Sequence, residues 1–179
     1  LDSLYSMNTQ SNEGNFSYEI DALSFAHAIA TFGKNPIKIP LHPKTGRPSF
    51  QLGLISEENG IKAEGELHTA MVDTKILMEF VKKFSKSEPE IWEQFKKTSH
   101  KSKVSELLET RDTYFYSCFY MAGRPYIYAY SFVGFDNDGA AIFVDLLNFN
   151  EENLKKSPED VQRRKGDKKN KIFRRVFTN

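Results

Sequence analysis

The chain has 179 residues, of which 39% are hydrophobic and 13% aromatic, and its formal net charge at pH 7 is +1. This length suits one ordinary domain or parts of two small ones, and the apolar content argues against a disordered chain. The single cysteine, Cys118, excludes an intramolecular disulfide and favours a reducing, cytoplasmic setting. No apolar run approaches the roughly 18 residues of a membrane-spanning helix, so we expect no membrane association.

The first half of the chain is predicted to be mainly helical. Residues 1–17 are polar and are predicted to form a loop, whereas apolar residues at helical spacing predict a helix over 18–31. Four prolines within 34–48 exclude a helix there and indicate an extended surface loop. Three further helices are predicted over residues 50–58, 68–86 and 90–98.

Caps and apolar spacing predict how these helices are anchored. Ser49 is expected to cap the helix over 50–58. The helix over 68–86 is expected to bury one side, formed by Met71, Ile76, Leu77, Phe80 and Phe84. In the helix over 90–98, Trp92 and Phe95 are expected to pack.

The second half of the chain reads as β-structure. Segments rich in aromatic and β-branched residues predict antiparallel strands over 113–121, 126–135 and 140–147. Turn residues at 122–124 and 136–139 separate these strands, which predicts two hairpins. A fourth strand is predicted over residues 171–177. The change from helical to β-structure is therefore expected somewhere within residues 88–112.

Charge is distributed unevenly along the chain. Residues 82–103 carry a net charge of +4 and residues 155–179 carry +7, while the two remaining parts are acidic. A basic block can bind phosphate groups. For an isolated lysine run, however, a solvated face or a loose tail is the commoner explanation.

One short motif carries candidate chemistry. His68 to Asp73 read H-x-A-x-x-D at the start of a predicted helix. A histidine at the first turn and an aspartate one turn further can face one cleft. The aspartate can hold a divalent cation, and the histidine can accept a proton from an attacking water, which is what a metal-dependent nuclease requires. The structural alternative is that His68 helps to cap the helix and Asp73 is a surface acid.

The surroundings of this motif extend the pattern. The segments Gly46–Leu52 (GRPSFQL) and Asn59–Ile61 (NGI), then the His68–Asp73 motif and a long amphipathic helix, resemble bacterial exodeoxyribonuclease I, in the DEDDh 3′→5′ exonuclease family. The resemblance is strongest over residues 45–104. It implies an α/β + β fold, in which the C-terminal part of a ribonuclease-H-like exonuclease domain precedes an SH3-like antiparallel β domain.

The resemblance also implies domain limits. The exonuclease portion is expected over residues 1–88, a helical linker over 89–110, and a truncated SH3-like domain over 111–179. The chain begins with Leu1 rather than methionine, so we expect it to be a piece of a longer protein.

Roles for single residues follow from the same resemblance. His68 matches the general base, and Asp73 matches the last aspartate ligand of a site for two Mg²⁺ ions. Residues expected to contact nucleic acid are Arg47, Phe50, Lys101 and Lys103. Gln51 stands where a basic residue is expected in relatives, which argues against a phosphate contact at that position.

The family's other carboxylates, including a D-x-E pair, lie upstream of the region that this chain resembles. The 179 residues contain no D-x-E. We therefore expect this chain to be inactive alone, and a complete parent to degrade single-stranded DNA, with single-stranded-DNA-binding protein as a possible partner. The alternative is a non-catalytic module that binds nucleic acid or a protein. A relative that acts on RNA is a weaker third interpretation.

Overall fold

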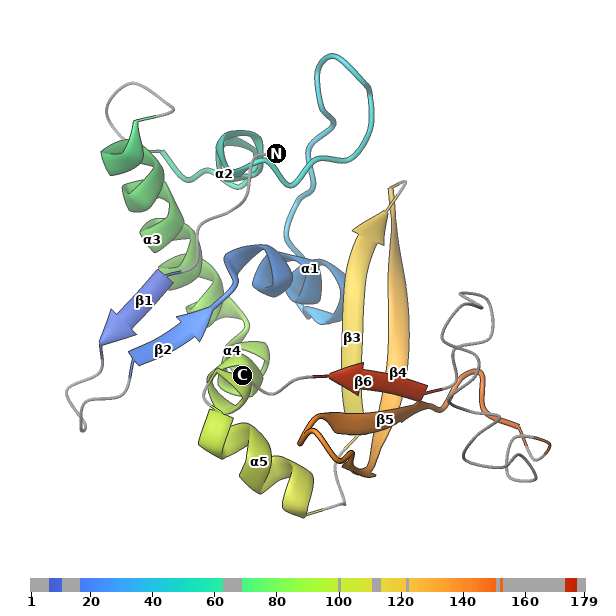
Figure 1. Ribbon diagram of the computed structural model, residues 1–179. Coiled ribbons are helices and arrows are strands. Elements are labelled where there is room, and N and C mark those ends of the chain that lie inside the picture. The colour runs from blue at the N-terminus through green and yellow to red at the C-terminus, as the bar shows by residue number, and fades with distance from the viewer. Residues whose placement is uncertain are drawn as a thin grey trace. The chain divides into compact units, whose positions relative to one another are not determined.

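The chain divides into two compact units, shown element by element in a computed structural model (Figure 1). The structure describes residues 7–10, 17–62, 69–99, 101–110, 114–121, 123–150, 152 and 173–176. One unit comprises Leu1–His100 with Cys118–Tyr126, and the other comprises Lys101–Ser117 with Ile127–Asn179. Within the described ranges, no helix combines the length and apolar character that crossing a bilayer requires.

The first unit begins with a strand pair that the sequence did not predict. β1 (Met7–Gln10) pairs antiparallel with β2 (Ser17–Ile20), with Met7 opposite Ile20. The predicted loop over 1–17 is therefore wrong for β1, and the helix predicted from residue 18 starts later. The carboxylate of Asp21 accepts the backbone N–H groups at positions 23 and 24, which fixes the first turn of α1 (Ala22–Phe32) after β2 has ended.

Three further helices complete the described helical part of the first unit. They are α2 (Leu52–Glu58), α3 (Ala70–Ser87) and α4 (Pro89–Thr98), so the three helices predicted here are confirmed. Pro89 occupies the first turn of α4, where its missing N–H does no harm. Gln51, not Ser49, is the N-cap of α2. The Ser49 hydroxyl instead accepts a hydrogen bond from the Gln51 N–H at 3.3 Å, because the chain stays extended through these residues.

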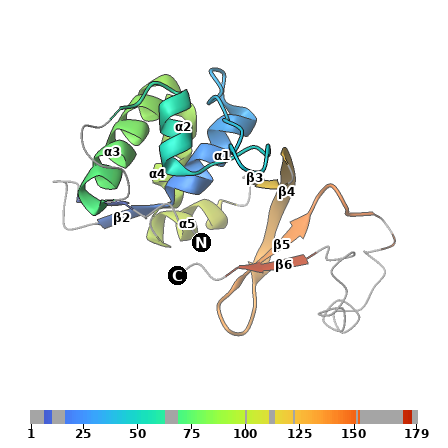
Figure 2. The same cartoon turned by 90° about the horizontal axis from the view of Figure 1, so that it is seen from above.

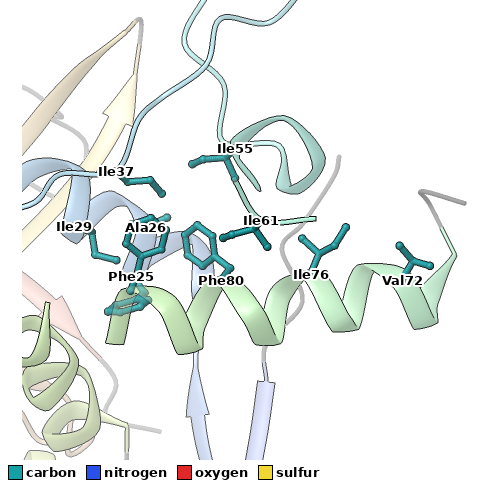
Figure 3. Close-up of a cluster of buried hydrophobic side chains, with 10 residues drawn as sticks. Phe25, Ala26, Ile29, Ile37, Ile55, Ile61, Val72, Ile76 and Phe80 are labelled. Atoms are coloured by element: carbon teal, nitrogen blue, oxygen red, sulfur yellow. The ribbon is translucent and has the colours of Figure 1, made fainter. Parts of the chain in front are cut away.

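Helix α3 packs beside α1, α2 and α4 (Figure 2). Val72, Ile76 and Phe80 lie on one side of α3 and point toward Ile55 and Ile61 (Figure 3). The buried core consists of Phe25, Ala26, Ile29, Ile37, Ile55, Ile61, Val72, Ile76, Phe80 and Phe84. This packing anchors the start of α3 against α2 and against the segment that contains Ile61.

Most of the predicted buried side of α3 is confirmed, but Met71 is wrong. Its side chain is 69% exposed, whereas Val72 is buried. Residues spaced by four lie on one stripe of a helix, and the stripe that starts at Val72 leaves Met71 turned about 100° away from it. Trp92 and Phe95 pack as expected, each with its ring centroid 5.3 Å from that of Phe25.

The sheet has four strands in the order β3-β4-β5-β6. They are β3 (Tyr114–Met121), β4 (Arg124–Phe135), β5 (Ala141–Asp145) and β6 (Phe173–Val176), so all four predicted strands are confirmed. The pairs β4–β5 and β5–β6 are antiparallel. Gly123 and Gly139 adopt positive φ angles of 81° and 76° in the two predicted turns. Both turns are therefore where the sequence placed them.

The second unit has its own small core on one face of this sheet. Leu108 of α5 (Lys101–Glu109) is fully buried against Ala141 and Phe143 of β5. Tyr130 and Phe132 of β4 pack against the same cluster. Burial raises the pKa of the Tyr130 hydroxyl, an effect that nearby Arg174 opposes.

Candidate functional site

Asp73 lies in the first turn of α3 and is half-buried. Its backbone N–H donates to the Thr69 carbonyl at 3.0 Å, and the Thr69 hydroxyl accepts from the Val72 N–H at 3.4 Å. Thr69 is thus the N-cap of α3. The positive end of the helix dipole favours a carboxylate at this position. Because Val72 is buried in the core, the adjacent backbone of Asp73 has a fixed position.

His68 lies outside the residues that the structure describes. The alternative role of His68, in which it helps to cap the helix, likewise lies outside the described residues. Whether His68 faces the same cleft as Asp73 stays a prediction.

The described residues do not fit a site for two metal ions. Among them, no group of three or more histidine, cysteine, aspartate or glutamate side chains could hold a metal. Asp73 offers one carboxylate, and two cations need several such oxygen ligands. No catalytic step through a bound cation therefore follows from the described part of the chain.

Arg47 projects from a tight loop between α1 and α2. Leu41 and Pro48 form an isolated antiparallel bridge across the base of this loop. The N–H of His42 donates to the Arg47 carbonyl at 2.8 Å, and the N–H of Gly46 donates to the His42 carbonyl at 2.8 Å. Gly46 has a φ angle of 63°, which glycine adopts without steric cost. The loop backbone is therefore ordered by its own hydrogen bonds, while the Arg47 side chain is exposed.

Phe50 is half-buried and belongs to a ring cluster in the first unit. Its ring meets that of His27 edge-on at a centroid distance of 4.5 Å and lies 5.0 Å from that of Tyr120. The Tyr120 hydroxyl donates to the Ala30 carbonyl at 3.3 Å. Phe50 therefore has a packing role in the structure, and a contact with nucleic acid stays a prediction.

The environment of His27 shifts its titration. Half-burial lowers the pKa of this imidazole from its ordinary value of 6.5, and the carboxylate of Asp21 opposes that shift. The neutral ring is accordingly the form that the packed cluster favours. The ring partners of His27 lie at positions 50 and 120, so local sequence patterns gave no sign of these contacts.

The expected nucleic-acid contacts fall into different units. Arg47 and Phe50 share the loop before α2, and the first unit also holds Asp73. Lys101 and Lys103 belong to the second unit, at the start of α5. Lys103 is exposed.

Glu88 is a further residue whose contacts sequence reasoning missed. It is only 4% exposed, and its carboxylate accepts backbone N–H groups of residues 34 and 35. Nothing local in the sequence distinguishes this glutamate from its exposed neighbour Glu90, because its partners lie more than 50 positions earlier.

Comparison with known proteins adds a likeness of fold. Neither a protein-family model nor a curated protein matches the sequence. Solved structures do match, among them E. coli exonuclease I in complex with a dA16 oligonucleotide, with a TM-score of 0.64 and 22% identity. The ExoI/SSB-Ct complex matches with a TM-score of 0.61 and 22% identity, and E. coli exonuclease I in complex with a 5cy-dT13 oligonucleotide with 0.55 and 21%.

These matches extend over most of this chain but over a minor part of the other proteins. Each covers 89% of this chain and 36% of the matched chain. The family resemblance inferred from the sequence is thus confirmed in part: the chain has the fold of part of exonuclease I.

Proposed function

We propose that this chain is part of a metal-dependent 3′→5′ exonuclease that degrades single-stranded DNA. The observation that carries the proposal is the fold shared over 89% of the chain with exonuclease I, whose matched structures contain a dA16 or a 5cy-dT13 oligonucleotide. The sequence resemblance over residues 45–104, which contains the His68–Asp73 motif, supports the same activity independently of the fold.

In this proposal the helices and the sheet correspond to two domains of such an enzyme. The helical part is the C-terminal portion of a ribonuclease-H-like exonuclease domain, and the antiparallel sheet belongs to an SH3-like domain. The packing of Trp92 and Phe95 on Phe25 favours including α4 in the exonuclease portion rather than in a linker.

His68 and Asp73 are the proposed catalytic pair. A neutral imidazole at position 68 would accept the proton of the attacking water. Asp73 would be one ligand of Mg²⁺, and the other ligands would come from carboxylates outside these 179 residues. We therefore propose that the chain alone does not hydrolyse DNA.

The remaining proposed contacts bind the strand. Arg47, exposed on its ordered loop, suits a phosphate group, and Phe50 lies three positions further along the same segment. Lys101 and Lys103 would contribute further charge from α5. The ExoI/SSB-Ct complex motivates single-stranded-DNA-binding protein as a proposed protein partner.

The first test uses the 179-residue chain with a 3′-labelled dA16 strand and Mg²⁺, and follows anisotropy and cleavage together. We expect binding that weakens with salt, without cleavage. Absence of binding would count against the proposed function. Cleavage that is lost in His68→Ala but kept in the control Lys86→Ala, at an exposed position of α3, would support the exonuclease and refute the proposed inactivity of the isolated chain.

The second test uses a longer parent protein that includes the upstream region. His68→Ala should abolish hydrolysis of single-stranded DNA while binding survives, and the control Lys86→Ala should retain activity. If the His68 variant kept its turnover, this residue would not be the general base. Matched DNA and RNA strands in the same assay would show which of the two the enzyme prefers.

A non-catalytic binding module is the second candidate function. It is favoured by the absence of D-x-E from the sequence and of any metal-binding cluster among the described residues. A parent protein that binds single strands but never hydrolyses them would support this candidate. Hydrolysis that depends on His68 would exclude it.

A further inference from the structure

A loop and a turn of the first unit lie close together where Gly123 approaches Pro48, at the base of the loop. They are residues 42–48, between α1 and α2, and residues 123–126, at the turn between β3 and β4 (Figure 1). A Cβ atom added to Gly123 would lie 3.1 Å from Cγ and 3.2 Å from Cδ of Pro48. Gly123 also has a φ angle of +81°, which side chains rarely tolerate. Glycine at this position therefore lets the turn approach the base of the loop; we call residues 42–48 and 123–126 together the two-loop surface.

The charge of the two-loop surface is entirely positive. Lys44, Arg47 and Arg124 are exposed on it. No aspartate or glutamate occurs within residues 34–56 or 113–135. In the described part of the chain the ion pairs lie elsewhere, and none of them involves these three side chains. An anionic ligand would accordingly meet exposed cations without having to displace a carboxylate from the same loops.

Arg124 is partly preorganised for such a ligand. Its guanidinium carbon lies 5.2 Å from the centroid of the Tyr126 ring, and its Nε donates to the Tyr126 hydroxyl at 3.1 Å. A guanidinium carries five N–H donors, so one bond does not exhaust it. Stacking on the ring restricts the side chain before binding, which lowers the entropy cost of holding a phosphate group.

The structure beneath the turn keeps it in place. Tyr120, just before the turn, packs on His27 and Phe50 and donates to the Ala30 carbonyl. The 42–48 loop is ordered by its own backbone bonds. Ring packing fixes the turn, and backbone hydrogen bonds fix the 42–48 loop. The backbone positions that carry the positive side chains are therefore defined.

We infer that the two-loop surface binds backbone phosphates of the DNA strand, with Arg47 and Arg124 as its principal contacts and Gly123 as the joint between its halves. This inference rests on the proposed function. It adds the β3–β4 turn to the strand's path, a segment to which the sequence resemblance assigned no role. Arginine suits this task because its planar fork matches the geometry of phosphate oxygens.

The test measures binding of labelled dA16 to the 179-residue chain at several salt concentrations. For single strands, each lost phosphate contact should lower the slope of log affinity against log salt by about 0.7, and weaken binding about eightfold near 50 mM salt. We expect Arg47→Gln and Arg124→Gln each to show one such loss, and the double variant to show both. Lys86→Gln makes the same charge change at an exposed position of α3 and should leave the slope unchanged.

A further variant separates position from charge. Gly123→Val keeps every charge but forces a side chain toward Pro48, so it should weaken binding about as much as Arg124→Gln. Circular dichroism of this variant would show whether the sheet is retained. If the sheet were lost, the inference would be decided by the two arginine variants alone.

The outcomes distinguish this inference from the proposed function. If the unaltered chain binds DNA and neither arginine variant changes the slope, the two-loop surface is not a contact and the proposed function stands. If Lys86→Gln weakens binding as much as the arginine variants do, the effect is one of general charge and the inference is wrong. If the unaltered chain does not bind, both are overturned.

Discussion

The Oε1 atom of Glu88 accepts a hydrogen bond of 2.6 Å from the backbone N–H of Asn35. Its Oε2 atom accepts the N–H of Lys34 at 3.0 Å. The first residue stands between α3 and α4, and the other two follow the end of α1. One buried carboxylate therefore supplies the partners for two loop N–H groups and ties three helices together.

Replacing this carboxylate should destabilise the first unit. Because Glu88→Ala leaves two backbone N–H groups without their acceptors, we expect the free energy of unfolding to fall by about 2–4 kcal/mol. Glu88→Gln keeps one acceptor oxygen and should cost less, about 1–2 kcal/mol. Urea unfolding of both variants measures the difference. The control is Glu90→Gln, which removes only an exposed ion pair with Lys34 and should cost far less than Glu88→Ala. A loss equal to that of Glu88→Ala would contradict the assignment.

The corrected buried side of α3 gives a second prediction. Phe80 is 2% exposed within the core, so Phe80→Ala should lower the free energy of unfolding by about 3–5 kcal/mol. Met71, although predicted from the sequence to be buried, is 69% exposed, and Met71→Ala should change that free energy by no more than about 0.5 kcal/mol. Urea unfolding decides between the two assignments, since comparable losses would mean that Met71 is buried after all.

His27 should make stability depend on pH. The folded state lowers its pKa below the ordinary 6.5 through burial, so near and below that pH the unfolded chain binds the proton more readily. The contribution of His27 is therefore fully present above pH 6.5 and declines as the pH falls through and below it.

The measurement compares urea midpoints of the unaltered chain and His27→Gln from neutral to mildly acidic pH. The variant should lose part of the decline on the acid side. Met71→Ala, which changes an exposed residue without a titratable group, serves as the control and should keep the decline. If both variants showed the same pH profile as the unaltered chain, His27 would not be its source.

Among the acidic residues of the second unit that the structure describes, Asp145 should be the most sensitive to substitution. It is 1% exposed at the end of β5, and Oδ1 accepts the N–H groups of Leu147 and Asn148 at 3.0 and 3.3 Å. We expect Asp145→Ala to cost about 2–4 kcal/mol of stability, because buried donors lose their acceptor, and Asp145→Asn to cost less. The exposed Glu106→Ala should stay within about 0.5 kcal/mol. Thermal or urea unfolding would contradict the prediction if the two alanine variants behaved alike.

The sequence predicted those helices and strands that are determined by neighbouring residues, such as turn glycines and apolar stripes. The turn glycines Gly123 and Gly139, between aromatic and β-branched runs, located the strands of the sheet. The stripe from Ile76 to Phe84 located the long helix. In contrast, β1 has no apolar alternation, and its extended form depends on pairing with β2. A pairing of this kind leaves little trace in the sequence of either partner.

In the candidate site, too, local sequence signals were predictive, whereas contacts between distant residues were not found. The motif correctly placed Asp73 near the start of a helix, but α3 begins at Ala70, so Asp73 lies in its first turn and not one turn further. The ring contacts of Tyr120 and the close approach of Gly123 to Pro48 join residues far apart in the chain, so no spacing rule could find them. The sequence resemblance named Arg47 but not Arg124, whose place beside the same loop emerges only from the fold.

Residues 118–126 belong to the first unit, although the chain on both sides of them belongs to the second. The polypeptide consequently passes from one unit to the other at three places, after residues 100, 117 and 126. A recombination event that exchanged the sheet between two relatives would also import a foreign turn opposite Pro48 and a foreign residue opposite Ala30. Residues 118–126 and the segments around Ala30 and Pro48 must therefore be inherited and adjusted together.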